Sequence, residues 1–501
     1  MDGIYRFGSY IIAVGMHDGA PYKARRRKHM TLNNTEDFGM CENTGGAAHK
    51  RSALILTLGC RVNHYESEAI AEHLRRTGFR VSLSEESGSG YDTVIVNTCS
   101  VTAMSDRKSR QIVHRALKNN PSAAFYITGC SAQNYPEVYK KIPGVRAVIG
   151  NRSKLETAVL AAVGSTAREP IGTDLSDAPF EQMSVSSFGR LRSYIKIEDG
   201  CRSNCAYCII PSLRGDIRCK APGDVIAEAE SLVHGGSPEI VLTGIELSAY
   251  SYGLSELITR LDAIDGIRRI RLGSLDPSFM RVDFVDAYAA CKHTMPHFHI
   301  SMQSGCDRTL SMMRRRYNTA QVLEKLIYMR KRMPSLRLSA DIICGFPGET
   351  DEDFDRTRDF LSEADFFHLH IFPYSKREGT EAAKMPDQVP SDIAKERVAV
   401  LMRDNSERQR KTVSDLAASC TTVNLLAERV SQTDSGIVLA GHTEEFFEAS
   451  AGLTEQETDA LLAHIPPREG QSADDPRRLR GCELTARITG LIGNTVTTEL
   501  I

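Results

Sequence analysis

The sequence predicts an α/β protein with three folded parts: an N-terminal α/β domain with a parallel sheet, a central partial (β/α)6 barrel and a small C-terminal β-barrel. Three observations support this. Short apolar strands alternate with helices from Ala53 to Ile149. Six more strand–helix units lie between Tyr194 and Tyr374, and five short β-like segments follow residue 420. Strand–helix alternation favours parallel sheets, whereas short strands separated by glycine and polar turns favour a small barrel.

Length and composition narrow the class further. The chain has 501 residues, of which 41% are hydrophobic and 25% charged, as is usual for a globular protein. The 62 Lys and Arg residues are nearly balanced by 64 Asp and Glu residues, so contact with nucleic acid must depend on local basic patches and not on net charge. No apolar run reaches the roughly 18 residues of a membrane span, and the short apolar stretch at 10–16 makes a poor signal peptide. We therefore expect a cytoplasmic protein without a membrane partner.

Composition also suggests where the domains divide. Residues 1–50 are polar and carry a basic run at 23–28, which favours a solvated tail or an over-long translation start over an RNA-binding arm. The predicted parts are a disordered extension at 1–50, an N-terminal domain at 51–165, a linker at 166–190, a central domain at 191–415 and a C-terminal β-barrel at 416–501.

Three strands of the N-terminal domain each run into a cysteine. The predicted strands are Ala53–Leu58, Thr93–Val96, Ala124–Ile127 and Val145–Ile149, with helices at His64–Thr77, Met104–Lys118 and Tyr135–Lys141. The cysteines, here called the N-terminal triad, are Cys60, Cys99 and Cys130. Parallel strands bring their carboxyl ends to one edge, so these thiols could converge there and leave one iron of a cluster open. A single cysteine is more often simply buried.

A second group of cysteines follows the first strand of the central domain. Strands are predicted at Tyr194–Ile197, Glu239–Leu242, Arg268–Leu272, Phe298–Met302, Leu336–Ile343 and Phe366–Phe372, too few for a closed eight-unit barrel. The central triad is Cys201, Cys205 and Cys208, in a C-x3-C-x2-C pattern. Three thiolates are one short of the four that close a structural site, and an open iron can chelate and reductively cleave S-adenosylmethionine. The alternatives are a zinc knuckle with a distant fourth ligand, or thiols packed in a core.

Other strand ends of the central domain carry small or polar residues that could contact S-adenosylmethionine. These candidates are Thr243, Gly244, Ser274, Gln303, Gly345 and Glu349. Glycines let a ligand approach the backbone, and the polar side chains offer hydrogen bonds to a ribose or an amino-acid head group. Turn formation or helix capping explains each of them equally well, and Thr350 itself has the pattern of a cap. The sequence singles out no catalytic acid or base.

Basic residues and the C-terminal segments suggest contact with RNA. Arg314–Arg316 could face RNA, whereas the basic helix at 394–411 is better explained as a solvated face. Strands are predicted at Thr421–Leu425, Gly436–Leu439, Glu445–Ala449, Leu484–Ile488 and Asn494–Thr498, with a flexible insertion at 463–480. Five such strands suggest an oligonucleotide-binding barrel, with a packing domain as the alternative.

From about Leu54 to its end, the chain resembles the radical-SAM methylthiotransferases. The matching stretches occur in order: Thr57-Leu58-Gly59-Cys60-Arg61-Val62-Asn63, Val96-Asn97-Thr98-Cys99, Thr128-Gly129-Cys130, the central triad with Tyr207 before its last cysteine, and Ile343 through Thr350. The resemblance implies an N-terminal cluster domain, a radical-SAM core and a C-terminal RNA-binding barrel of the TRAM type. It also implies that each triad binds one 4Fe–4S cluster.

Within that family, the first motif is most similar to enzymes that methylthiolate N6-threonylcarbamoyladenosine beside the anticodon of tRNA. Enzymes acting on isopentenyladenosine typically carry Tyr-Gly-Cys-Gln-Met-Asn there, and those acting on a ribosomal-protein aspartate carry Ser-Leu-Gly-Cys-Pro-Lys-Asn. The resemblance implies that the central cluster cleaves one S-adenosylmethionine to start radical chemistry at adenine C2. The N-terminal cluster would supply sulfur, and a second S-adenosylmethionine the methyl group.

The implied cofactors are therefore two 4Fe–4S clusters and S-adenosylmethionine. The implied partners are tRNA and a low-potential electron donor of the flavodoxin or ferredoxin type. Methylthiolation of isopentenyladenosine tRNA or of a ribosomal-protein aspartate remains an alternative within the family. A zinc-binding RNA-binding protein without catalytic activity is the alternative outside it, although two sets that both lack a fourth ligand argue against zinc.

Overall fold

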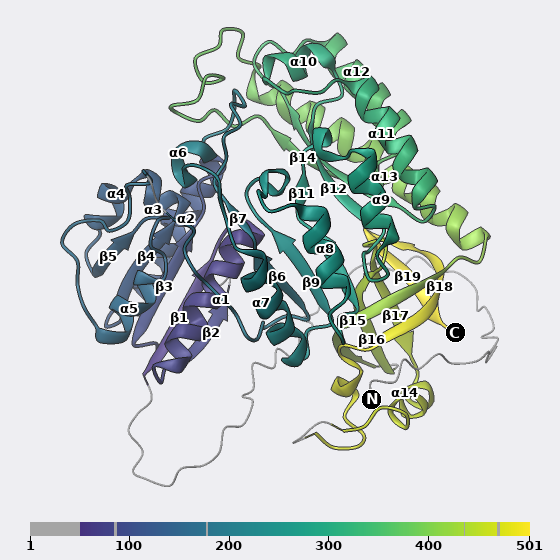
Figure 1. The fold of residues 1–501 in the computed structure, drawn as a ribbon, viewed down its shortest axis with the longest axis horizontal. Helices are drawn as coiled ribbons and strands as arrows, with labels where there is room; N and C mark the ends of the chain where they lie inside the picture. Colours follow the sequence, from purple (N-terminus) through teal and green to yellow (C-terminus); the bar gives the residue numbers. More distant parts are fainter. Residues whose placement is uncertain (1–50, 85–87, 177–178, 435, 468–470) are drawn as a thin grey trace. The chain divides into compact units, whose positions relative to one another are not determined.

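The computed structural model describes residues 51–84, 88–176, 179–434, 436–467 and 471–501. The extension predicted at 1–50 lies outside these residues. The described chain divides into two compact units, 51–405 and 406–501, and helix α13 (Ser391–Ala418) runs from the first into the second (Figure 1). Across the described ranges, we find no helix with the length and apolar character needed to cross a membrane.

Five parallel strands form the sheet of the N-terminal domain, in the order β2-β1-β3-β4-β5. They are β1 (Ser52–Thr57), β2 (Arg80–Ser84), β3 (Thr93–Thr98), β4 (Ala124–Gly129) and β5 (Val145–Ile149). All four predicted strands are confirmed. Strand β2 escaped prediction because it is an edge strand with polar residues and a largely half-buried surface, so its apolar signal is weak.

Helices cover both faces of this sheet (Figure 1). On one face, Ile55 and Ile95 pack with α1 (Arg61–Arg76) and α5 (Glu156–Val163). On the other, Leu54 and Val94 pack in a core that also contains residues of the remaining helices, α2 (Ala103–Asn119), α3 (Cys130–Asn134) and α4 (Pro136–Lys140). This two-sided burial explains why β1, β3 and β4 are buried at every position and carry continuous apolar runs that do not alternate with polar residues.

The central domain contains two parallel sheets whose strands follow one another in sequence order. The first has the order β6-β9-β10 and the second β11-β12-β13-β14. Their bounds are β6 (Arg192–Lys196), β9 (Glu239–Thr243), β10 (Arg269–Leu272), β11 (Ser274–Leu275), β12 (His297–Gln303), β13 (Arg337–Cys344) and β14 (His368–Pro373). Only Gly273 separates β10 from β11. The six predicted strands are therefore all present, and a short antiparallel pair, β7 (Glu198–Asp199) and β8 (Arg218–Cys219), follows β6.

Helices connect the central strands and bury one face of each sheet. They are α6 (Ile210–Arg214), α7 (Pro222–His234), η1 (Leu247–Ala249), α8 (Leu254–Asp262), η2 (Pro277–Phe279), α9 (Val282–Ala290), α10 (Asp307–Met312), α11 (Thr319–Arg332) and α12 (Asp351–Ala364). Phe298, Ile300 and Met302 share a core with Leu326 and Met329 of α11. The predicted cap is confirmed, because the Thr350 hydroxyl accepts a hydrogen bond from the Asp353 N–H at 3.2 Å.

The C-terminal unit is a closed five-stranded barrel in the order β15-β16-β17-β19-β18. The strands are β15 (Thr422–Thr433), β16 (Gly436–Thr443), β17 (Glu448–Leu453), β18 (Glu483–Ile492) and β19 (Thr495–Leu500). Four predicted segments match their strands, whereas the one predicted at Glu445–Ala449 shares only its last two residues with β17. Helix α14 (Glu455–Leu462) was not predicted. The segment predicted to be flexible contains η3 (Pro476–Leu479), because Asp475 caps this turn and Leu479 joins the barrel core.

Candidate functional site

The cysteines of the N-terminal triad follow three adjacent strands. In the sheet, β3 lies between β1 and β4, with Thr57 opposite Asn97 and Thr98 opposite Gly129. Cys60 caps the start of α1, Cys99 follows β3 directly, and Cys130 begins α3. The carboxyl ends of adjacent parallel strands therefore bring the three residues to one edge of the sheet, where ligands bind in open α/β folds.

The three thiols are close enough to influence one another. A Cβ atom on Gly59, whose φ is 105°, would lie 3.0 Å from the Cys99 sulfur. Burial, together with the charges of Cys130 and Cys60, raises the pKa of Cys99 to about 11. Cys60 keeps an exposed surface, yet desolvation by the surrounding protein still raises its pKa, while the Arg214 guanidinium lowers it. The Cys60 and Cys99 thiols, whose pKa values are raised, therefore hold their protons more tightly than a free cysteine does.

The loop of the central triad is held by backbone hydrogen bonds. The Cys201 N–H donates to the Gly215 carbonyl at 3.0 Å, and the Cys208 N–H donates to the Cys205 carbonyl at 3.0 Å. Gly200 has a φ of 95°, and a Cβ there would lie 2.0 Å from the Asp216 carbonyl oxygen, so the turn before Cys201 requires glycine. Burial raises the pKa of Cys208 to about 12, with further contributions from the other two cysteines.

The donor sets fit iron–sulfur clusters better than single metal ions. Within the part of the chain that the structure describes, no three Cys, His, Asp or Glu side chains are arranged to hold a metal ion. A four-iron cube holds its cysteines farther apart than a single ion does. Each triad offers sulfur, the ligand that iron–sulfur clusters take.

The residues predicted to contact S-adenosylmethionine lie at several strand ends of the central sheets. Thr243 is the last residue of β9 and is buried. Gln303, at the end of β12, has a φ of 68°, and Gly345 follows β13 with a φ of 75°. Ser274 pairs with His299, in the middle of β12, so it lies deeper along the strands than Gln303.

Two of these residues make contacts that stabilise turns. Gly244 has no room for a side chain, because a Cβ would lie 2.8 Å from Glu198 Oε2. Glu349 Oε2 accepts hydrogen bonds from the Gly345 N–H and from Arg397 Nη1, both at 2.6 Å. These contacts explain why the turns need these residues, and binding of S-adenosylmethionine by the six stays a prediction.

Sequence reasoning missed two carboxyl groups near the central triad, the buried Glu198 and the half-buried Glu246. Glu198 Oε2 accepts hydrogen bonds from the N–H groups of Ile245 and Glu246, at 2.8 and 2.7 Å. Burial raises the pKa of Glu198 to about 8 and also raises the pKa of Glu246. The Glu246 carboxylate acts electrostatically on Cys201 and is therefore close to the triad. In the sequence, the available signal for Glu246 was its position two residues after Gly244, at the end of the same strand.

Arg315 departs from the prediction that Arg314–Arg316 face RNA, whereas Arg314 and Arg316 are exposed and their part of the prediction stays open. Arg315 Nη1 donates to the Cys205 sulfur at 3.1 Å, and its Nη2 contacts Asp276 Oδ2 at 2.6 Å. The side chain is only 8% exposed, whereas its neighbour Arg314 pairs with Glu381 at the surface. Arg315 therefore places a permanent positive charge beside the central triad. No sequence signal connects it with a cysteine 110 positions earlier.

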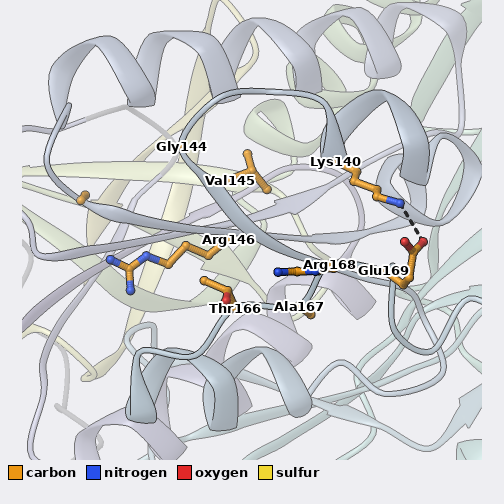
Figure 2. A pocket seen from close by; sticks show the side chains of 9 residues that line it. Lys140, Gly144, Val145, Arg146, Thr166, Ala167, Arg168 and Glu169 are labelled. Carbon is orange, nitrogen blue, oxygen red and sulfur yellow. Dashed lines mark hydrogen bonds and ion pairs between the residues drawn. The ribbon is translucent and has the colours of Figure 1, made fainter.

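A hollow on the N-terminal domain contains none of the predicted site residues (Figure 2). It has a volume of about 660 Å³ and includes Val145, the first residue of β5, so it lies at the edge of the sheet opposite the N-terminal triad. Arg146 and Arg168 line it, and Lys140 points towards Glu169, with which it forms an ion pair of 2.7 Å (Figure 2). The candidate site is therefore defined by the triads and not by this hollow.

Two family models match the chain. The model of the radical SAM superfamily matches residues 195–361, and that of an uncharacterised protein family, UPF0004, matches residues 52–150. The first range contains the central triad and the second contains the N-terminal triad.

Curated relatives cover most of the chain. The threonylcarbamoyladenosine tRNA methylthiotransferase MtaB of Bacillus subtilis (strain 168) is 34% identical over 431 residues, 83% of this chain and 95% of that protein. The protein of the same name from Rickettsia prowazekii (strain Madrid E) is 40% identical over 70% of this chain and 82% of its own length. The tRNA-2-methylthio-N(6)-dimethylallyladenosine synthase of Arthrobacter sp. (strain FB24) is 31% identical, over 88% of this chain and 83% of its own length.

Similarity to solved structures is more distant. The radical S-adenosylmethionine methyltransferase TsrM from Kitasatospora setae, with cobalamin and a [4Fe-4S] cluster bound, aligns with a TM-score of 0.49 at 16% identity. The alignment covers 77% of this chain and 82% of that chain.

Proposed function

The chain belongs to the radical-SAM methylthiotransferase family, and on that basis we propose that it converts N6-threonylcarbamoyladenosine beside the anticodon of tRNA into its 2-methylthio derivative. The observation that carries this proposal is the similarity to relatives named for that substrate, at 34–40% identity in the two cases described. Relatives named for dimethylallyladenosine are 31–33% identical. The run Leu58-Gly59-Cys60-Arg61-Val62-Asn63 supports the same substrate.

The enzyme uses two 4Fe–4S clusters and S-adenosylmethionine. Cys201, Cys205 and Cys208 would hold one cluster, and Cys60, Cys99 and Cys130 would hold the other. When bound, a cluster with an open iron supplies the electron that cleaves S-adenosylmethionine, which gives access to the unactivated C2 carbon of adenine. Near the central triad, the Glu246 carboxylate offers an acceptor for an ammonium group.

The domains take distinct parts in this function. We assign residues 51–165 to the N-terminal cluster domain, 166–190 to a linker, 191–415 to the radical-SAM core and 416–501 to a TRAM-like RNA-binding barrel. The two central sheets would be halves of one partial (β/α)6 barrel, because their strands succeed one another in order and only Gly273 separates β10 from β11. A base in the anticodon loop can leave its stack and enter such a barrel.

The partners follow from the chemistry. The substrate is tRNA, and a low-potential donor of the flavodoxin or ferredoxin type would reduce the clusters. We place the enzyme in the cytoplasm, where tRNA is found and where thiols stay reduced.

Mass spectrometry of tRNA nucleosides tests the substrate. Cells that lack the gene should lose 2-methylthio-N6-threonylcarbamoyladenosine and accumulate its precursor. Restoring the wild-type gene should restore the product, and restoring a variant with Ala at the central triad should not. Loss of the methylthio derivative of isopentenyladenosine instead would overturn the substrate while keeping the reaction class. Unchanged nucleosides, together with zinc and no iron in the purified protein, would favour the non-catalytic alternative.

A further inference from the structure

Helix α6 begins two residues after the last cysteine of the central triad and ends on a buried arginine that reaches the N-terminal domain. Arg214 is fully buried. Its Nη1 donates to Glu66 Oε1 at 2.7 Å, and its Nη2 donates to Asn63 Oδ1 at 2.7 Å. Both partners lie on α1, which starts directly after Cys60. One side chain thus connects the central loop with the helix that follows the first cysteine of the other triad.

Asn63 extends this connection to two cysteines of the N-terminal triad. Its side-chain amide donates to the Leu58 carbonyl at 2.7 Å and to the Thr98 carbonyl at 3.0 Å. Leu58 lies two residues before Cys60, and Thr98 directly precedes Cys99. Both amide hydrogens and the amide oxygen of Asn63 are therefore used. The hydrogens hold the backbone next to Cys60 and Cys99, and the oxygen accepts from Arg214, so Asn63 links Arg214 to the surroundings of both cysteines.

Asn151 makes the equivalent connection to the third cysteine. Its side-chain amide donates to the Leu213 carbonyl at 2.8 Å and lies 3.7 Å from the Cys130 sulfur. Cys130 also packs in a small apolar cluster with Ile209 and Leu213, which follow the central triad closely in sequence. Helix α6 therefore contacts the surroundings of every member of the N-terminal triad.

The charges around Arg214 make this arrangement stiff. Glu66 also contacts the ammonium groups of Lys154 and Lys196, and all four of these residues are almost entirely buried. Arg214 further contacts Asp199, which lies two residues before Cys201. Moving one buried charge away from its partners leaves the others uncompensated in a medium of low polarity, so the group resists displacement.

We propose that Asn63, Asn151, Leu213 and Arg214 form a bracket that fixes the spacing between the two triads. These are positioning residues, and the inference rests on the proposed assignment of a cluster to each triad. Sulfur supplied at one triad must reach a carbon activated at the other, and an error of about 1 Å in such an approach can cost on the order of a hundredfold in rate. The bracket should therefore control how often a cleavage of S-adenosylmethionine leads to product.

Two substitutions loosen the bracket without removing a cysteine. Arg214→Lys keeps the positive charge but cannot reach Asn63 and Glu66 together. Asn63→Ala removes no charge and frees both carbonyls. Arg202→Met is the matched control, because Arg202 lies in the loop of the central triad but is exposed and pairs only with the exposed Asp216. If Arg214→Lys does not fold, Asn63→Ala alone decides the test.

The full-length, anaerobically reconstituted proteins would be compared in three measurements. These are iron content, methylthio product formed per 5′-deoxyadenosine, and the spin–spin interaction between the two reduced clusters in the electron paramagnetic resonance spectrum. Both bracket variants should retain the iron content and 5′-deoxyadenosine formation of the wild type. Product per 5′-deoxyadenosine should fall on the order of a hundredfold, and the spin–spin interaction should change. Arg202→Met should match the wild type in all three.

The proposal would be overturned by an unchanged product ratio and an unchanged spin–spin interaction in variants with full iron. Selective loss of iron from the N-terminal triad would also overturn it, because the contacts would then support one triad and not the spacing between two. Failure of the proposed function is distinguishable: a wild-type protein that forms no methylthio product refutes the substrate, while the spin–spin interaction still tests the bracket.

Discussion

Replacing Glu198 with Gln should make the protein more stable at alkaline pH, by an amount that the structure allows us to calculate. Glu198 is fully buried next to the central triad. One carboxyl oxygen accepts two backbone N–H groups, and the other has no hydrogen-bond partner among the described residues. Burial raises the pKa of this carboxyl from 4.5 to about 8, although the two N–H groups oppose the shift. The folded protein therefore holds this proton more tightly than the unfolded chain does.

The direction of the effect follows from this difference. Below pH 4.5 the carboxyl is protonated in both states and carries no penalty. As the pH rises towards 8, the unfolded chain releases the proton and the folded protein does not, so the free energy of unfolding falls. A shift from 4.5 to about 8 corresponds to about 5 kcal/mol, at about 1.4 kcal/mol per unit. Gln keeps the accepting oxygen but cannot ionise, so Glu198→Gln should remove this loss.

Urea unfolding of the metal-free protein under reducing conditions, followed by circular dichroism between pH 5 and pH 8.5, measures the effect. The difference between Glu198→Gln and wild type should be small at pH 5 and should grow to several kcal/mol at pH 8.5. Glu256→Gln, at an exposed position of α8, is the matched control and should give a curve parallel to that of the wild type. Parallel curves for Glu198→Gln as well would refute the reasoning, because the buried carboxyl would then ionise as easily in the folded protein as in the unfolded chain.

Four further results are expected. Alanine at all three positions of the central triad should leave about half of the roughly eight irons per chain, measured by iron analysis after reconstitution; unchanged iron would contradict the assignment. Alanine at all three positions of the N-terminal triad should preserve 5′-deoxyadenosine formation and abolish the methylthio product, both measured by chromatography with mass spectrometry. Loss of both products from a protein that kept its central cluster would count against a division of roles between the triads. Lys220→Met should lower the free energy of unfolding by about 3–5 kcal/mol, because it leaves the Glu228 carboxylate buried without its cation. Adding Glu228→Gln, which removes the charge but keeps an acceptor for the Val185 N–H, should recover much of that loss in urea unfolding, and no recovery would show that the unpaired charge was not responsible. Truncation before Thr421 should weaken tRNA binding by a few kcal/mol in a filter-binding assay and leave the iron content unchanged. The reason is that backbone and stacking contacts of a small RNA-binding barrel contribute on that scale. Unchanged affinity for tRNA would favour a packing role for the barrel.

The sequence alone determined the fold class, most of the strands and the six cysteines. Strands such as β3 and β13 are detected because apolar periodicity is a local property of the chain. The convergence of Cys60, Cys99 and Cys130 was predictable in outline, because parallel strands share the direction of their carboxyl ends. The edge strand β2 was missed because it is only partly buried and reads as a polar segment.

Only the tertiary structure decided which strands are neighbours and which side chains meet across domains. The order β1-β3-β4 brings the N-terminal triad together, and other orders of the same strands would fit the same sequence pattern. The contacts of Arg315 with Cys205 and of Arg214 with Asn63 join residues 110 and 151 positions apart. An arginine suits a solvated surface as well as a buried site, so its charge alone does not predict where it lies. Whether Arg214 and Arg315 are buried depends on packing against residues far away in the sequence. The local sequence pattern therefore identified the candidate ligands, and long-range packing determined the charges and amides that surround them.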